Sequence, residues 1–438
     1  MRGKVGRIAG ENLSRHRRFV DRRRGHNGLE KAATRPSKKA RGTSVVSGGL
    51  TALALHLSNK FSKAKKHKGQ NIMFSPLSIY TALGLLAAGA RGTTLDELLA
   101  VLGAASRDEV AEIVRVLTER VIAAADDPSG PLVVTSVCGV WYQMDVSLKP
   151  AYRHAAVDSY KAETGAVDFA TKAEDAREEI NSWVAEATKN LITSVLPPDS
   201  VDGDTRLVLT NAIYFKGEWE KAFLQSRTKE HKFYRLDGST VRVPFMAGSG
   251  SKYMVSCYDG FKVLKLPYKN GGGSGRYSMC VFLPTERCGL RSLADQMASG
   301  GSSFLFEHLP SSTTSVTDLR LPKFKLSFFC SMKKVLKRLG LRAAFSSSKA
   351  DLSDMVVDSG ERLFVGNVFH KAVVEVNEEG TEAAASTAIV IQRFCRMIIP
   401  APPVDFVADH PFAFFIVEEV SGAVLFAGHV LDPSTNSE

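Results

Sequence analysis

The sequence lacks long hydrophobic runs. It has no stretch of about 18 apolar residues, and no apolar run of about seven residues follows the first charges of the N-terminal region. The first absence argues against a membrane-spanning helix and the second against a secretory signal peptide. An organelle transit peptide stays open, because the N-terminal region is rich in arginine and poor in acids, although it lacks an amphipathic stripe. These absences favour a cytosolic or nuclear protein without a membrane partner.

Cysteine is also scarce, and none of the cysteines belongs to a CxxC pair. Scattered cysteines in a long chain do not have the spacing of a disulfide framework. We therefore expect a reducing compartment, with Cys395 exposed and four or five of the others acting as small buried hydrophobic residues. The full set is Cys138, Cys257, Cys280, Cys288, Cys330 and Cys395.

Signatures of enzymes and of metal sites are missing as well. There is no GxSxG, no HExxH, and no pair of histidines at the spacing of two helix-borne metal ligands. The glycines at 271–273 belong to no GxGxxG motif and precede no GKS or GKT, so they predict a hairpin connection rather than a phosphate cradle. Catalytic triads do assemble from distant residues, but nothing here designates one. We expect a protein that is not an enzyme, with no metal and no cofactor.

Excess charge is absent from most of the chain. The net charge is +11, yet residues 1–42 carry 14 Lys and Arg against 3 acids, and the remaining 396 residues carry 43 charges of each sign. A neutral body argues against a specific nucleic-acid partner. Residues 1–43 lack periodic apolar residues and are expected to form a basic, disordered extension, with a nuclear-import signal as the alternative. Residues 44–434 are expected to form one domain, since 44% apolar residues suffice for a large core.

An unusual segment runs from Val373 to Met397, beginning as a strand and passing through an acidic turn. The β-branched residues at its start fit a buried strand, whereas the alanines after Glu382 pack little in a sheet. If this segment forms a strand, alternate side chains point to opposite faces. One face then carries no charge, and the other begins with Glu382 and ends with Gln392. Such a strand can lie between two existing strands with its uncharged face on a core. That face consists of Thr381, Ala383, Ala385, Thr387, Ile389 and Ile391.

Residues 377–386, Asn-Glu-Glu-Gly-Thr-Glu-Ala-Ala-Ala-Ser, resemble the hinge of the reactive-centre loop of serpins, and of plant serpins in particular. Residues 71–79, 211–219 and 405–412 resemble further serpin landmarks, and the resemblance covers about nine tenths of the chain. It implies a single serpin domain over 44–434 with a mixed α/β fold. That fold has a large central, mostly antiparallel sheet, further sheets, surrounding helices and an exposed reactive-centre loop at about 378–400. It also leaves an extracellular location open.

The resemblance implies an irreversible suicide-substrate inhibitor of serine endopeptidases, with cysteine endopeptidases as further targets. The protease would cleave the loop, and residues 381–392 would insert into the main sheet before the acyl-enzyme hydrolyses. About a dozen new ladder hydrogen bonds, at roughly 1 kcal/mol each, would supply on the order of 10 kcal/mol. The alternative is a non-inhibitory relative with the same fold, acting as a binding or storage protein.

The hinge keeps the residue types of inhibitory family members. Thr381, Ala383 and Ala385 are small and can pass between strands without steric penalty. Gly380 gives the hinge backbone freedom. Glu378 matches a residue at the point where the loop enters the sheet.

Two further groups of residues match family positions. Trp219 and Lys323 match residues at the loop insertion point, where Lys323 and Glu378 are expected to form an ion pair. A second group matches positions that close or open the sheet, and its hydroxyls, amide and imidazole can form a buried hydrogen-bonded cluster. It consists of Ser75, Ser78, Asn211 and His370.

The family arrangement places the cleaved bond after the fourteenth residue that follows the hinge glycine, which gives Phe394–Cys395. A shift by one residue gives Arg393–Phe394. Phenylalanine suits chymotrypsin-like proteases and arginine suits trypsin-like ones; papain-like proteases are a third candidate. Many plant relatives have arginine at the cleaved position, so Phe394 is a departure. The expected partner is thus a protease, chymotrypsin-like first, and the protein is expected to be a monomer.

Individual elements are predicted by local patterns. Apolar spacing indicates a helix from about Ser44, and Thr94–Glu97 has the form of a capping box. Pro76 after Ser75 indicates a helix start with Ser75 as N-cap. Strands are predicted at 132–142, 205–215, 261–266, 276–283, 319–328, 363–376, 413–417 and 423–430, and helices at 173–189 and 332–339.

Overall fold

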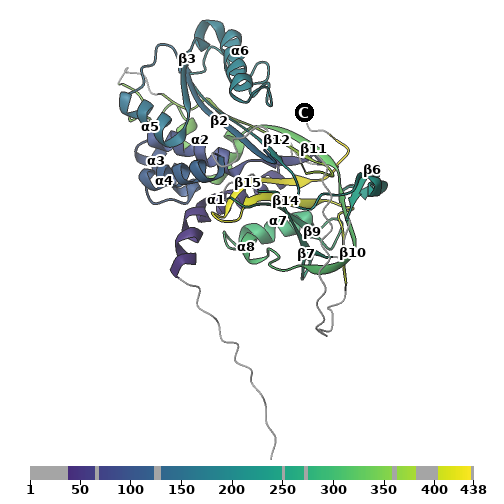
Figure 1. Ribbon diagram of the computed structural model, residues 1–438. Helices are drawn as coiled ribbons and strands as arrows, with labels where there is room; N and C mark the ends of the chain where they lie inside the picture. Colours follow the sequence, from purple (N-terminus) through teal and green to yellow (C-terminus); the bar gives the residue numbers. More distant parts are fainter. Residues whose placement is uncertain are drawn as a thin grey trace, which may run out of the picture.

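The computed structural model describes residues 38–64, 69–122, 130–248, 252–270, 275–357, 363–380 and 403–435, with the backbone alone at 38–47 and 122. Helices surround two sheets in this part of the chain, and the mixed α/β class is confirmed (Figure 1). The α-helices are α1 (Lys38–Ser62), α2 (Pro76–Ala88), α3 (Gly92–Leu102), α4 (Arg107–Leu117), α5 (Pro150–Tyr160), α6 (Phe169–Ala187), α7 (Leu290–Ser299), α8 (Phe304–Glu307) and α9 (Lys333–Leu339).

The five-stranded sheet contains the strand that leads into the predicted loop. Its order is β11 (Phe324–Ser331), β12 (Asn367–Val376), β4 (Leu207–Gly217), β2 (Leu132–Gln143) and β3 (Glu163–Val167). The β11–β12 and β2–β4 pairs are antiparallel, whereas β12–β4 and β2–β3 are parallel. The centre of this sheet is therefore a parallel pair.

The ten-stranded sheet has antiparallel pairs throughout, except that β13 runs parallel to β10. Its order is β1 (Ile72–Phe74), β15 (Ala423–Val430), β14 (Phe412–Glu418), β9 (Tyr277–Pro284), β8 (Phe261–Pro267), β7 (Lys252–Tyr258), β10 (Thr314–Pro322), β6 (Thr240–Ala247) and β5 (Lys229–Tyr234), with β13 (Val404–Val407) on β10.

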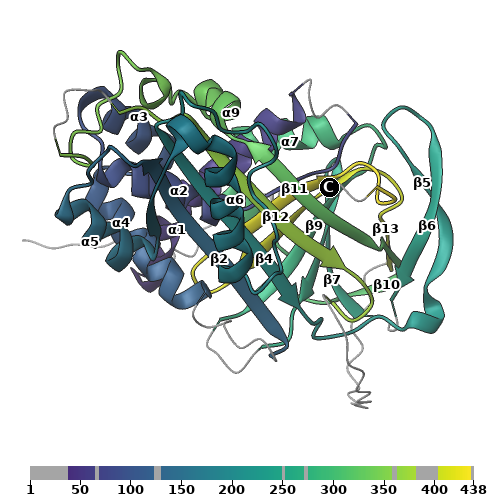
Figure 2. The ribbon, with the colours of Figure 1, turned by 90° about the horizontal axis from the view of Figure 1, so that it is seen from above.

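Two apolar clusters lie on opposite faces of the five-stranded sheet. The larger one joins this sheet to α1, α2 and the ten-stranded sheet, and contains Phe61, Leu83, Val374 and Phe414. The smaller one lies beneath α6, which crosses the other face (Figure 2). Both faces of the central strands are thus buried, which explains their nearly continuous apolar sequence.

The N-terminal helix begins earlier than its apolar spacing predicts. Its backbone is helical from Lys38 rather than from Ser44. Residues 38–41 are Lys, Lys, Ala and Arg, all good helix formers, and a regular backbone needs no apolar stripe in its first turns. The expected boundary at residue 43 therefore falls inside α1.

The predicted capping box at Thr94–Glu97 is wrong. Helix α3 begins at Gly92, and its N-cap Arg91 makes no side-chain capping bond. The Thr94 hydroxyl instead accepts the backbone N–H of Asp351, and the Glu97 carboxylate accepts those of Arg342 and Ala343. Both side chains tie α3 to distant backbone, which no local pattern reveals.

The strand predicted at 319–328 is two strands in different sheets. Pro322 ends β10, and β11 begins at Phe324. Proline cannot donate to a ladder, so a chain leaves one sheet readily at this point. Lys323 lies between the strands, and its backbone N–H donates to Pro244 O at 2.9 Å.

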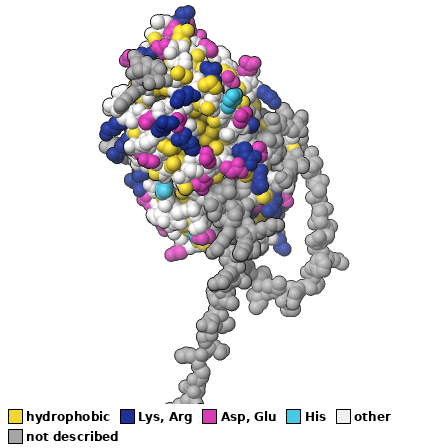
Figure 3. All heavy atoms as spheres, turned by 90° about the vertical axis from the view of Figure 1, so that its left-hand side faces the viewer, with side chains coloured by type: hydrophobic (Ala, Val, Ile, Leu, Met, Phe, Trp, Pro, Cys, Tyr) yellow, Lys and Arg dark blue, Asp and Glu magenta, His cyan; other side chains and the backbone are white. Residues whose placement is uncertain are grey.

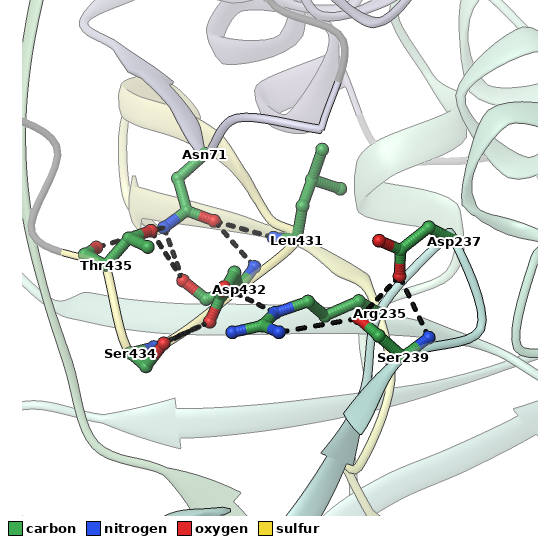
Figure 4. A network of polar contacts seen from close by, with 8 residues as sticks. All are labelled: Asn71, Arg235, Asp237, Ser239, Leu431, Asp432, Ser434 and Thr435. Carbon is green, nitrogen blue, oxygen red and sulfur yellow. Dashed lines mark hydrogen bonds and ion pairs between the residues drawn. The ribbon is translucent and has the colours of Figure 1, made fainter. Parts of the chain in front are cut away.

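The end of the described chain is held by Asn71 (Figure 4). Its amide nitrogen donates to Asp432 O, and its amide oxygen accepts the backbone N–H groups of Leu431 and Asp432. Arg235, which follows β5, donates from Nε to the Asp432 carboxylate at 2.6 Å. These bonds fix the β5–β6 hairpin against the chain that follows β15.

The cysteines are less buried than expected. Cys138, Cys280 and Cys330 are buried, but Cys257 and Cys288 are exposed. Burial raises the pKa of the Cys138 and Cys280 thiols to about 12. Cys395 lies outside the described residues.

Candidate functional site

The site is organised by two neighbouring parallel strands. Residues Asn367–Val374 of β12 pair with Val208–Phe215 of β4 in continuous register. β12 ends at Val376, the described chain runs on to Gly380, and its next described residue is 403, just before β13. A strand that turned back from the end of β12 and ran between β12 and β4 would be antiparallel to both. An incoming strand can be antiparallel to both neighbours only when the two neighbours are parallel to each other.

Immediately after β12, a tight turn over residues 377–380 is fixed against the end of β4. The backbone N–H of Asn377 donates to Gly380 O at 2.9 Å. The indole N–H of Trp219 donates to Asn377 O at 2.9 Å, and its backbone N–H donates to Glu379 O at 2.8 Å. Phe223 N–H donates to Glu378 O at 2.7 Å. The first residues of the hinge are therefore clamped to the strand beside which the loop would enter.

Gly380 has a stricter role than backbone freedom alone. Its φ of 122° is one that side chains disfavour. A Cβ there would lie 2.1 Å from Gly217 O and 2.6 Å from the Trp219 backbone nitrogen. Only glycine permits this close approach of the turn to the end of β4.

The expected ion pair between Lys323 and Glu378 is present, with Nζ 2.8 Å from Oε2. The Thr228 hydroxyl donates to the other carboxylate oxygen at 2.7 Å. The Glu378 side chain is 6% exposed, and burial alone would raise its pKa. The bonds from Lys323 and Thr228 outweigh burial and hold the pKa of Glu378 below its usual value.

Sequence reasoning missed three residues of this clamp: Phe223, Thr228 and Tyr268. The Tyr268 ring stacks on Trp219, with ring centroids 4.5 Å apart. Thr228 and Phe223 lie before β5, and no motif marks them. Their roles come from a backbone N–H and from a hydroxyl placed by the sheet, which sequence patterns do not display.

The second predicted cluster is also assembled. Ser75 caps α2 by accepting the backbone N–H of Ser78, and the Ser78 hydroxyl donates to Asn211 Oδ1 at 2.9 Å. His370 of β12 lies opposite Asn211 of β4 in the parallel ladder, and its Nδ1 hydrogen-bonds to the same oxygen. The cluster therefore bridges the two strands that an inserting segment must separate.

The hydrogen bonds of His370 define its protonation. The backbone N–H of Ser75 can only donate, so Nε2, at 2.9 Å, accepts. Asn211 Oδ1 can only accept, so Nδ1 carries the proton. Burial lowers the pKa of His370 to about 3, which agrees with a neutral imidazole. The amide nitrogen of Asn211 has no partner in the described part of the chain.

Several predicted site residues lie outside the described residues. They are the hinge residues Thr381, Ala383 and Ala385, and the candidate residues of the cleaved bond, Arg393, Phe394 and Cys395. Within the described ranges, no group of three or more His, Cys, Asp or Glu is placed to hold a metal. In the same ranges no helix is long and apolar enough to cross a membrane.

Comparison with known proteins identifies the architecture. The family model for serpins, described as serine protease inhibitors, matches residues 49–433. Serpin-Z2A of Oryza sativa subsp. japonica is 50% identical over 422 residues, covering 89% of this chain and 98% of its own length. Serpin-Z2B of the same organism is 49% identical over 412 residues, with the same shares covered.

Solved structures agree with the sequence comparison. Arabidopsis AtSerpin1 in its native stressed conformation has a TM-score of 0.80 and 38% identity, covering 92% of this chain and 100% of its own. Uncleaved ovalbumin has a TM-score of 0.72 and 27% identity, covering 89% and 100%. The family is settled by two findings, the family model that matches most of the chain and the relatives with about 50% sequence identity. The described site agrees with both. The chain belongs to the plant serpins, and it is a protease inhibitor of the serpin family.

Proposed function

We propose that the protein inhibits chymotrypsin-like serine proteases irreversibly, through cleavage at Phe394–Cys395 and insertion of residues 381–392 between β4 and β12. The observation that carries this proposal is the parallel β4–β12 ladder, which lies directly beside the clamped hinge. Insertion removes one parallel ladder and forms two antiparallel ones. The net gain of about a dozen hydrogen bonds, at roughly 1 kcal/mol each, supplies the driving force.

The protein contributes no catalytic residue to this reaction. The hydroxyl of the target's serine attacks the carbonyl of Phe394, the peptide bond breaks, and the amine of Cys395 leaves with the proton from the target's general base. Insertion before water attacks the ester leaves the protease covalently attached. Thr381, Ala383 and Ala385 serve this step because they are small on the inward face.

Mixing the purified protein with chymotrypsin, and separately with trypsin and papain, tests the proposal. We expect an SDS-resistant complex with chymotrypsin and a released C-terminal peptide that begins at Cys395 by mass spectrometry. A complex with trypsin and a peptide beginning at Phe394 would move the cleaved bond to Arg393–Phe394. Clean cleavage by all three enzymes without any complex would contradict irreversible inhibition and favour the binding or storage function.

A further inference from the structure

The outward face of the β5–β6 hairpin carries two cations placed directly opposite each other. Lys232 of β5 pairs in register with Arg242 of β6, and both side chains are exposed. Like charges at opposed positions of an antiparallel pair destabilise it. This pair of like charges is unfavourable for the hairpin by itself, and an acidic partner would offset the repulsion.

These charges have no carboxylate partner among the described residues. Lys229 and Arg227 add two more exposed cations at the start of the hairpin, and Glu230 is the acid on the same strand. Arg242 and Arg227 donate to the backbone carbonyls of Glu230 and Gly248, and neither forms an ion pair with a described residue. We refer to Arg227, Lys229, Lys232 and Arg242 as the hairpin cations.

Some cations elsewhere on the described surface are paired. Arg115 forms ion pairs with Glu112 and Glu119. Arg177 of α6 likewise pairs with Glu174 and Glu178. On the face formed by α3, α4 and α5, positive and negative side chains alternate (Figure 3). The hairpin cations therefore place positive charge, without an ion pair among the described residues, close to the hinge of the loop.

The hairpin lies beside both ends of the reactive-centre loop. Thr228, immediately before β5, bonds to Glu378 of the hinge, while the chain after the loop forms β13, which pairs with β10 next to β6. The hairpin is also firmly held, by the bond between Arg235 and Asp432 and by Tyr234 N–H on Asp409 O. Figure 2 shows β5, β6, β10 and β13 together at one end of the molecule. A protease bound to the loop is therefore brought close to this face.

Shape and apolar exposure indicate a protein rather than a simple polyanion. An open hollow of about 390 Å³ has Arg242, Pro244 and Lys325 among its lining residues. Leu224 and Leu236, one before the hairpin and one at its tip, are each 46% exposed. Protein interfaces combine apolar contacts with a charged rim.

We propose that the outward face of the β5–β6 hairpin is a secondary docking surface for the target protease, and that it selects proteases with an acidic surface beside the active-site cleft. This inference rests on the proposed inhibitory function, since the loop delivers the partner. Opposite charges accelerate encounter and discriminate among enzymes that cleave the same loop sequence.

The test measures binding without cleavage. Two chymotrypsin-like proteases, one acidic and one basic around the cleft, are prepared with the catalytic serine replaced by alanine. Their association rate constants with the full chain are followed by surface plasmon resonance from about 25 to 300 mM NaCl. For the double variant Lys232→Glu/Arg242→Glu, we expect the rate for the acidic protease to fall at least about tenfold at low salt. The rate for the basic protease should rise.

The matched control is Lys334→Glu/Arg338→Glu on α9. Both residues are exposed, the charge change is the same, and α9 follows the far end of β11, about 26 Å from its start. We expect less than a twofold change in either rate. Equal effects of the two double variants, or none from the hairpin variant, would overturn the docking surface. Binding of heparin but of neither inactive protease would reassign the face to a polyanion.

Failure of the docking surface and failure of inhibition can be told apart. Active proteases mixed with the hairpin variant should still form SDS-resistant complexes at an unchanged stoichiometry of inhibition, only more slowly. If the unsubstituted protein binds inactive proteases but traps no active one, inhibition is refuted and docking stands.

Discussion

At the scale of single residues, Glu378 fixes the hinge through its side chain. Its nearly buried carboxylate accepts from Lys323 and Thr228, so Glu378→Gln removes a charge-assisted bond. We expect this change to lower the free energy of unfolding by about 2 kcal/mol in urea denaturation. The matched control is Glu375→Gln, since Glu375 pairs with Lys325 at 3.0 Å and both side chains are much more exposed. The control should lose less than about 1 kcal/mol, and an equal loss in both variants would count against a buried lock.

His370 and His429, both buried, make stability depend on pH. Burial lowers the pKa of His370 to about 3 and that of His429 to about 4, whereas both titrate near 6.5 in the unfolded chain. As pH falls from about 6.5 towards 4, the unfolded state therefore takes up protons that the folded state does not. Stability falls by up to about 1.4 kcal/mol per pH unit for each histidine in this range.

Chemical denaturation at pH 7 and pH 5 checks this expectation, because the carboxylates with lowered pKa values titrate below this window. The variant His370→Gln should lose about half of the pH-dependent difference while folding at pH 7. If the free energy of unfolding of this variant changed between pH 7 and pH 5 as much as that of the unsubstituted protein, other groups would dominate the pH dependence.

Contacts were predictable where the side chain itself makes them. The Lys323–Glu378 ion pair and the hydrogen bonds of the four-residue cluster around His370 are present, and the roles of these residues in loop entry and sheet opening stay predictions. Thr228 and Phe223 were not predictable, because the fold alone brings a hydroxyl and a backbone N–H to the hinge. Gly380 was assigned for its backbone freedom, but the short distance to Gly217 O is a property of two residues 163 positions apart in sequence.

At the scale of elements, the inserting segment must separate β4 from β12 and pass beneath α6. Thr381 is its first inward residue, so Thr381→Arg would place a charge against a core at the start of insertion. We expect this variant to be cleaved at the loop as fast as the unsubstituted protein but to be turned over as a substrate. The stoichiometry of inhibition should rise at least about tenfold, measured by residual protease activity.

The control for this prediction is Glu382→Arg, which changes the neighbouring residue on the opposite face. It should retain most complex formation, because that side chain is expected to stay in solvent. Equal loss of inhibition in both variants would point to the loop's contact with the protease rather than to insertion.

Elements with regular apolar periodicity were predicted well, and those defined by tertiary contacts were not. Ser75 caps α2 with Pro76 at its first position, as the sequence predicts. The break at Pro322–Lys323 was missed, since the residues on both sides have strand character and only the sheets separate them. The parallel pairing of β4 with β12 is also invisible locally, although the function depends on it.

At the scale of the whole molecule, the intact protein pairs β4 directly with β12, in a parallel ladder that a further strand can enter. Cleavage of the loop by limited papain digestion frees residues 381–392 to insert between these two strands. A gain on the order of 10 kcal/mol, spread over the unfolding entropy of a domain of this size, raises the melting temperature by about 10 °C or more. Differential scanning calorimetry of intact and cleaved protein measures this shift. The cleaved Thr381→Arg variant is the control and should melt close to its intact form, because its hinge cannot enter. If the cleaved unsubstituted protein melted no higher than the intact one, the central ladder would hold no stored free energy, and trapping by insertion would have no driving force.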